Sequence, residues 1–315
     1  MWGRKRKRDL RDSIYDSCPS APVVDEQGIS RESAVETPPA TDGVDIEAAT
    51  PVAAEISPTI IEAETPRRGF WREDVSLNGG AILVALAMGI VIPALGQVLI
   101  YIVDFFVRLP DPVGLRWVDL TYTQISQLAV TILFMRLLAP SLKADFGMHL
   151  PRGKSYIGPA IFFGLLFGIV MAAVDHAPEI IAQRPPINMS PSVANIAGWL
   201  SFQGLISGLT DEPLYRGLIA TYLMVRTPGR MGWGRFDIPA GGVVAAAIWA
   251  VFHSYSYWIA SPLVVLGQQV YIFVLGVLFA FWLNKSKSLL APIVGHNISG
   301  LVEYALVFAM VAAWR

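Results

Sequence analysis

Apolar runs of membrane-spanning length follow one another along the chain from Gly79 onward. A helix needs about 20 apolar residues to cross a bilayer, and it satisfies its own backbone hydrogen bonds in lipid. The sequence therefore predicts an all-α fold, a polytopic membrane helix bundle with about seven transmembrane helices. The predicted helices lie near residues 79–103, 118–139, 156–174, 194–224, 240–258, 262–283 and 289–313.

Composition agrees with a membrane protein and limits its chemistry. Of the residues, 54% are hydrophobic and 16% are charged, whereas about 25% are charged in a typical soluble domain. The single cysteine, Cys18, lies near the N-terminus, which excludes an internal disulfide and a cysteine nucleophile within the helices. Any histidine-based site must come from His149, His176, His253 and His296.

Residues 1–75 have a different character from the rest. A basic start, residues 4–8, precedes a segment rich in Pro, Ala, Thr, Glu and Asp, which cannot bury enough apolar surface to fold. We predict a disordered cytoplasmic tail, anchored by its positive charge or by contact with anionic lipid. No apolar region follows the basic start, so a cleavable signal peptide is not expected. Residues 76–193 then form the N-terminal transmembrane helices and residues 194–313 form the core.

Lys and Arg gather in alternate loops between the predicted helices. The loop after the second helix carries Lys143, Arg152 and Lys154, and the loop after the fourth carries Arg226, Arg230 and Arg235. The loop after the sixth helix carries Lys285 and Lys287. Positively charged loops remain on the cytoplasmic side. The pattern predicts a multi-pass protein with its N-terminus in the cytoplasm.

The fourth predicted helix carries Asp211, Glu212 and Arg216. A charged residue at the bilayer centre costs roughly 2.5–3.5 kcal/mol, so such residues face the bundle interior and mark function. Glu212 and Arg216 are four residues apart and can form a pair on one helix face. Two interpretations stay open: a structural ion network between helices, or a functional site completed by residues further along the chain.

Two of the four histidines supply such partners. One ends the segment Trp249-Ala-Val-Phe-His253 of the fifth helix, and the other begins the pair His296-Asn297 of the seventh. At 1.5 Å per residue, Asp211 and His253 lie about 20 Å deep and His296 about 10 Å deep. We expect these three side chains to meet in the inner half of the bundle, although a single histidine is often only a helix-packing residue.

This order of residues resembles the CPBP family of intramembrane proteases, also called Abi, which includes CAAX proteases and bacteriocin-processing proteins. The family motifs are Glu-Glu-x-x-x-Arg, Phe-x-x-x-His and His-x-x-x-Asn, and the resemblance covers about residues 195–311. The letter-for-letter matches are Glu212, Arg216, His253 and His296.

The resemblance implies an intramembrane endopeptidase, a hydrolase of the CAAX prenyl protease-like type, that cleaves a peptide bond near the inner face of the plasma membrane. Asp211 takes the position of the first glutamate and would act as the base that activates water, together with His253 and His296. Glu212 and Arg216 would hold the geometry. The expected partners are a membrane-associated peptide or protein substrate and the lipid bilayer, with no nucleic acid.

Three motif positions differ from the family pattern: Asp211 replaces Glu, Trp249 replaces Phe and Gly300 replaces Asn. Aspartate can serve as a general base, but loss of an oxyanion donor typically costs about 100- to 1,000-fold in rate. Glu303 lies on the same helix face as His296 and is either a replacement polar group in the site or a buried hydrogen-bonding residue.

Two further functions are alternatives to proteolysis. A catalytically impaired member would act as a membrane scaffold or partner-binding protein. A transporter is a third hypothesis, which the absence of an internal repeat disfavours.

The cofactor is expected to be none or a divalent metal. Asp211, His253 and His296 are candidate zinc ligands. However, the chain lacks the His-Glu-x-x-His pattern of ordinary zinc proteases, and the same residues can activate water through hydrogen bonds. Zinc is therefore not favoured.

Overall fold

The structure is a computed structural model that describes residues 75–110, 115–186, 190–233, 236–253 and 260–314. Almost all of the predicted tail and residues 254–258 of the fifth predicted helix lie outside the described residues. The main helices are α1 (Gly79–Val107), α2 (Arg116–Leu142), α3 (Ile157–Asp175), α4 (Ala177–Ala182), α8 (Ala240–His253), α9 (Pro262–Ser286) and α10 (Leu290–Ala313).

The fourth predicted helix is a continuous rod of alternating α and π segments. These segments are α5 (Val193–Ser201), η1 (Phe202–Ser207), α6 (Gly208–Glu212), η2 (Pro213–Ala220) and α7 (Thr221–Arg226). A π segment widens the helix locally and is frequently found at functional sites. Pro213 begins the second π segment, where its missing N–H leaves a gap in the ordinary hydrogen-bond ladder.

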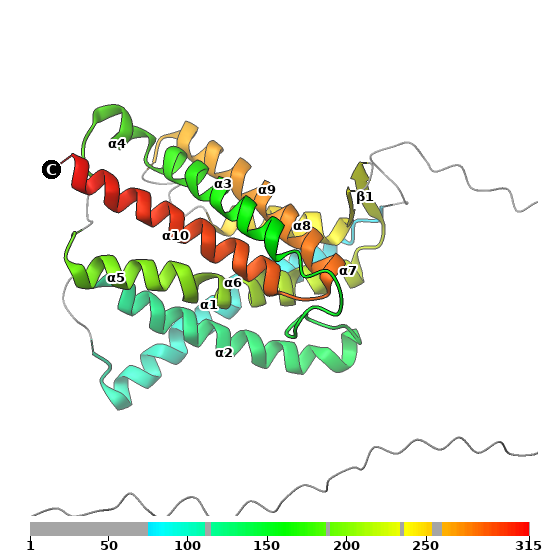
Figure 1. The fold of residues 1–315 in the computed structure, drawn as a ribbon. Helices are drawn as coiled ribbons and strands as arrows, with labels where there is room; N and C mark the ends of the chain where they lie inside the picture. The colour runs from blue at the N-terminus through cyan, green and yellow to red at the C-terminus, as the bar shows by residue number, and fades with distance from the viewer. Residues whose placement is uncertain (1–74, 111–114, 187–189, 234–235, 254–259, 315) are drawn as a thin grey trace, which may run out of the picture. The chain divides into compact units, whose positions relative to one another are not determined.

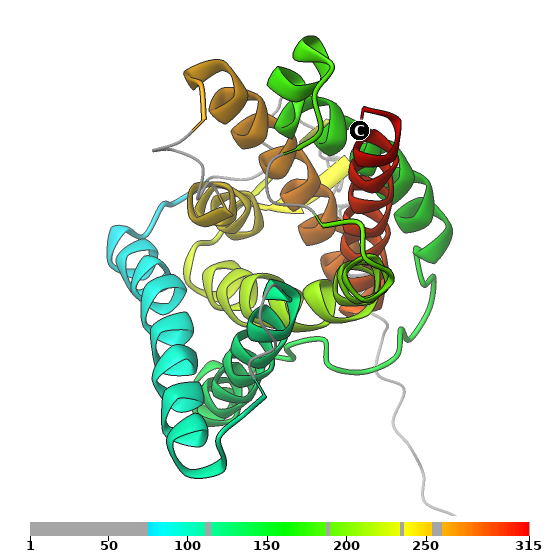
Figure 2. The same ribbon diagram turned by 90° about the vertical axis from the view of Figure 1, so that its left-hand side faces the viewer.

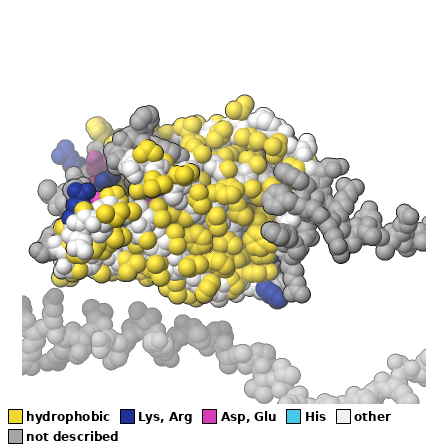
Figure 3. All heavy atoms as spheres, turned by 90° about the horizontal axis from the view of Figure 1, so that it is seen from above, with side chains coloured by type: hydrophobic (Ala, Val, Ile, Leu, Met, Phe, Trp, Pro, Cys, Tyr) yellow, Lys and Arg dark blue, Asp and Glu magenta, His cyan; other side chains and the backbone are white. Residues whose placement is uncertain are grey.

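The membrane fold class is confirmed. Among the described helices, α1, α2, α3, α9 and α10 are long and apolar enough to cross a membrane, and α8 is a shorter apolar helix. Figure 3 shows one face of the molecule covered by hydrophobic side chains, with charged side chains at its edges. Phe105, Phe106 and Leu263 are more than three-quarters exposed, as expected for side chains that contact lipid.

A short antiparallel hairpin was missed by the sequence analysis, which assigned residues 225–239 to a loop. Strands β1 (Arg230–Trp233) and β2 (Phe236–Pro239) pair with Arg230 opposite Pro239. The guanidinium of Arg230 lies 2.8 Å from the carboxylate of Asp237 across the hairpin. Strands of four residues are at the lower limit at which alternation of apolar and polar residues can be recognised.

The composite helix α5–α7 lies in the middle of the bundle (Figures 1 and 2). Its segments contact α1 and α2 on one side and α8 and α10 on others. Asp211, Glu212 and Arg216 of this rod are therefore surrounded by other helices instead of facing lipid.

Helices α3 and α10 run side by side and are the most closely packed pair (Figure 1). A stripe of small residues makes this approach possible: Ala160, Gly164, Gly168 and Ala172 are spaced four apart, and all are buried. Small residues at this spacing let two membrane helices come into backbone contact. The stripe fixes the position of α10, the helix that carries His296.

We expect Gly168→Leu to destabilise the bundle by about 1–3 kcal/mol, the usual effect of overpacking a filled interior. A Cβ atom at this position would lie 2.6 Å from Val302 Cβ and 2.7 Å from the carbonyl oxygen of Ser299. Unfolding of the purified protein in SDS–detergent mixtures measures the change. Gly158→Leu on the same helix is the matched control, because a Cβ there has no neighbour within 4 Å, and equal losses would contradict this packing.

The connection between α2 and α3 is tied to the start of α10. The carbonyl of Gly147 accepts a hydrogen bond from Leu289 N–H at 2.9 Å, and the carbonyl of His149 accepts one from the hydroxyl of Ser288. The imidazole of His149 contacts the Leu150 carbonyl at 2.8 Å and the Asp145 carboxylate at 2.6 Å. These two acceptors raise the pKa of His149 above its ordinary 6.5.

This raised pKa predicts a pH-dependent stability. The interactions of protonated His149 stabilise the fold fully below pH 6.5 and are lost as the pH rises through the higher pKa of the folded state. We expect His149→Gln to lower the unfolding temperature at pH 6 more than at pH 9. Thermal unfolding in detergent across this range is the measurement, and a constant difference between wild type and variant would contradict the assignment.

Candidate active site

The carboxylate of Glu212 is the centre of the polar cluster. Its Oε1 lies 2.7 Å from Nδ1 of His296, and its Oε2 lies 3.2 Å from Nε of Arg216. The side chains of Glu212 and Arg216 are 0% and 2% exposed, so this ion pair is removed from solvent and lipid. The predicted pair along one helix face is therefore present, and it also holds a histidine from α10.

Arg216 is packed between aromatic rings. Its guanidinium carbon is 3.6 Å from the ring centre of Trp249 and 5.0 Å from that of Phe279. A guanidinium over an indole face gains cation–π attraction, which is strongest where water is absent. Trp249, at the position of the family phenylalanine, thus helps to offset the burial of this charge.

Asp211 faces the other histidine. Its Oδ2 is 3.6 Å from Nε2 of His253, and its Oδ1 accepts a hydrogen bond of 3.2 Å from the side-chain amide of Gln127 on α2. Asp211 is 6% exposed. The ring of Tyr215 lies edge-on to His253, with ring centres 5.6 Å apart, so one helix supplies both the carboxylate and a wall for the imidazole.

All five predicted site residues lie together: Asp211, Glu212, Arg216, His253 and His296. The imidazole centres of the two histidines are 6.4 Å apart. The two imidazoles therefore lie close together, although the residue count along each helix places their backbones at different depths. The result is two acid–histidine pairs, Asp211 with His253 and Glu212 with His296.

Two further polar groups lie near His296, and one of them, Ser207, was not found by sequence reasoning. The hydroxyl of Ser207 lies 3.2 Å from Nε2 of His296. The amide oxygen of Asn297 accepts a hydrogen bond of 2.7 Å from Gly208 N–H. A Cβ at Gly208 would lie 2.9 Å from His296 Cβ, so this glycine lets α10 approach close enough for His296 to reach Glu212.

Glu303 does not join these pairs. Its carboxyl is hydrogen-bonded to Asp175 at the end of α3, and Asp175 also accepts hydrogen bonds from Tyr271 at 2.7 Å and Gln268 at 3.0 Å. Glu303 is therefore a buried hydrogen-bonding residue of a separate polar cluster, one of the two alternatives left open by the sequence.

The described residues contain no group of three or more His, Cys, Asp or Glu side chains arranged to hold a metal ion. Each histidine has its own carboxylate, and Nδ1 of His296 is already bonded to Glu212. As placed here, Asp211, His253 and His296 do not fit a shared zinc ion.

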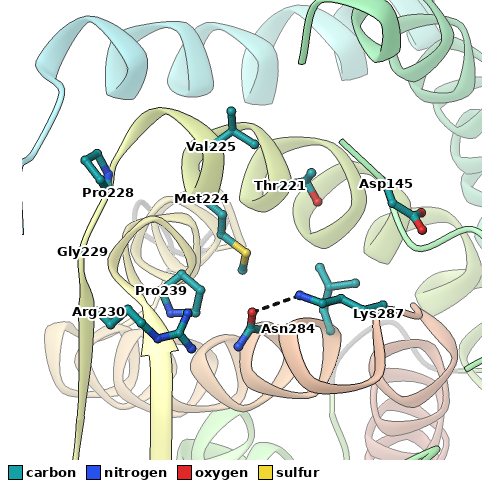
Figure 4. Close-up of a pocket in the computed structure, with 11 residues that line it drawn as sticks. Asp145, Thr221, Met224, Val225, Pro228, Gly229, Arg230, Pro239, Asn284 and Lys287 are labelled. Carbon is teal, nitrogen blue, oxygen red and sulfur yellow. Dashed lines mark hydrogen bonds between the residues drawn. The ribbon is translucent and has the colours of Figure 1, made fainter. Parts of the chain in front are cut away.

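A pocket of about 460 Å³ opens at the end of the bundle where α7 and α9 finish (Figure 4). Asp145, Arg230 and Lys287 line it, and the ammonium of Lys287 donates a hydrogen bond of 3.4 Å to Asn284. None of the five predicted site residues lines this pocket. The pocket shows instead that the α2–α3, α7–α8 and α9–α10 connections, which all carry charged residues, meet at one end of the bundle.

The structure thus places a set of paired acids and histidines inside a multi-pass helix bundle. Residues 193–302 match the family model described as type II CAAX prenyl endopeptidase Rce1-like. This segment therefore belongs to the CPBP family, and the resemblance seen in the motifs is confirmed. No curated protein and no solved structure matches the chain.

We expect Arg216→Ala to destabilise the protein by about 3–5 kcal/mol, the typical loss when one partner of a buried ion pair is removed. The variant leaves the Glu212 carboxylate without its cation in a dry interior. Thermal unfolding in detergent measures the loss. Arg226→Ala is the control, because Arg226 is exposed in the last turn of the same rod, and a loss no larger than that of the control would contradict the role of the pair.

Proposed function

We propose that this protein is an intramembrane endopeptidase of the CPBP type that hydrolyses a peptide bond of a membrane-associated peptide or protein. The observation that carries the proposal is the contact of Asp211 with His253, 3.6 Å apart, beside the buried pair of Glu212 and His296. Family membership supports the reaction class.

Asp211 acts as the general base. It takes a proton from a water molecule whose oxygen attacks the carbonyl carbon of the substrate, and it returns the proton to the leaving amine nitrogen when the C–N bond breaks. Its oxygen near His253 is the one that faces the reaction, because Gln127 is hydrogen-bonded to the other. His253 presents Nε2 to Asp211, so it can orient the water or stabilise charge on the attacked carbonyl.

Glu212 and Arg216 position the second histidine. Because Nδ1 of His296 is bonded to Glu212, Nε2 is the nitrogen available to the substrate, and it faces the hydroxyl of Ser207. A histidine that donates from one nitrogen to a carboxylate is held in one tautomer and one orientation. In this proposal the histidine acts through hydrogen bonds and needs no metal.

Cleavage takes place near the inner face of the plasma membrane, with the N-terminus in the cytoplasm. The support is the clustering of Asp145, Arg230 and Lys287 around one pocket. This brings the three Lys- and Arg-rich connections to a single end of the bundle, as the distribution of positive charge predicts for the cytoplasmic side. The bilayer is the second partner, and no nucleic acid is involved.

We expect Asp211→Asn and His253→Ala each to lower kcat by about 100- to 10,000-fold, the usual contribution of general acid–base catalysis. The probe is an internally quenched, prenylated peptide with a CAAX carboxyl terminus, assayed with purified protein in lipid vesicles. Asp119→Asn, an exposed position at the start of α2, is the matched control.

Retained cleavage by the Asp211 and His253 variants would contradict this mechanism. Absence of cleavage by the wild-type protein would contradict the proposed protease and favour the catalytically impaired scaffold. Gly300 at the position of the family asparagine is the observation that favours this second candidate.

A further inference from the structure

Gly300 lies directly beneath the side chain of Gln203. A Cβ atom built on Gly300 would meet Gln203 Oε1 at 2.7 Å and Gln203 Cβ and Cδ at 3.3 Å. These are the three heavy atoms closest to that position. The space in which a side chain at position 300 would begin is therefore occupied by the amide of Gln203 from the neighbouring helix.

Gln203 also has a fixed relation to the histidine of the site. The rod α5–α7 and helix α10 pack against each other in opposite directions, so that Ser207 contacts His296 and Gln203 contacts Gly300. Gly300 is four positions from His296 on α10, which is about one helical turn or 6 Å, and Gln203 is likewise four positions from Ser207. The amide of Gln203 thus lies one turn from the Ser207–His296 contact, on the same interface.

The amide of Gln203 has no hydrogen-bond partner among the described residues. Gln203 is half-buried, and its N–H groups keep accessible surface and have no partner in the described part of the chain. A peptide carbonyl of a bound substrate would supply one.

We propose that Gln203 is a catalytic residue that donates a hydrogen bond to the carbonyl oxygen of the scissile peptide, replacing the side chain that Gly300 lacks. The donor strengthens its bond as negative charge develops on that oxygen, and this is the charge that oxyanion-hole donors stabilise. Gly300 is then a permissive residue, since any side chain there would displace the amide. The inference rests on the proposed protease function.

The first test is Gln203→Met, which keeps the length of the side chain and removes its donor. With the prenylated peptide in vesicles, we expect kcat to fall by about 100- to 1,000-fold while KM and the unfolding temperature stay near those of wild type. Gln97→Met, at a half-buried position on α1, is the matched control. A kcat like that of wild type would overturn the role of Gln203.

The second test moves the amide to the other helix. Gly300→Asn alone should be poorly active, because its side chain collides with Gln203. The double variant with Gln203→Ala and Gly300→Asn should have a kcat at least tenfold higher than that of Gln203→Ala alone, since an amide donor again occupies the space. A double variant no more active than Gln203→Ala would count against an exchange of donors.

A binding measurement separates this inference from the proposed function. A phosphinate peptide carries a tetrahedral oxygen like that of the intermediate, so Gln203→Met should weaken its binding by about the same factor as kcat. Binding of the uncleaved peptide should not change. If Asp211→Asn is inactive and Gln203→Met binds the phosphinate normally, the protease proposal survives and the role of Gln203 is wrong. If Asp211→Asn remains active, the proposed mechanism itself fails.

Discussion

The buried ion pair between Glu212 and Arg216 is the interaction on which the rest of the structure depends. Removing two charges from water is expensive unless each is paired and further satisfied, and inside a membrane bundle no solvent can take over from a missing partner. Here the guanidinium lies on the face of Trp249 and the carboxylate also binds His296. The same contacts that make the charges tolerable thereby set the position of a histidine.

Close backbone approach is the second requirement of this arrangement. Gly168 on α3 and Gly208 on the composite rod each leave a space that α10 fills, so α10 is held on two sides. The π segments on both sides of α6 shift the register of the rod, and Asn297 binds backbone groups there, at Gly208 N–H and at the carbonyl of Leu205. Small residues and an irregular helix therefore bring His296 to a carboxylate.

Much of this site was readable from residue types alone. Charged residues in an apolar helix cost so much free energy that they normally pair with another group or serve a function. This rule singled out Asp211, Glu212 and Arg216. Ser207 and Gln203 gave no such signal, because uncharged polar residues are common in membrane helices and acquire meaning only from a neighbour. The contact between Gly300 and Gln203 joins two helices, so no spacing within one motif reveals it.

The sequence by itself determined the helical membrane fold, the approximate spans and the five ionisable side chains that meet inside the bundle. It did so because lipid forces each span to satisfy its own backbone and makes every buried charge costly. Only the tertiary structure decided which carboxylate meets which histidine, that Glu303 belongs to another cluster with Asp175, and that the imidazole centres of His253 and His296 lie 6.4 Å apart. These depend on helix tilt, on axial shift and on contacts between small residues, which the periodicity of a single helix does not contain.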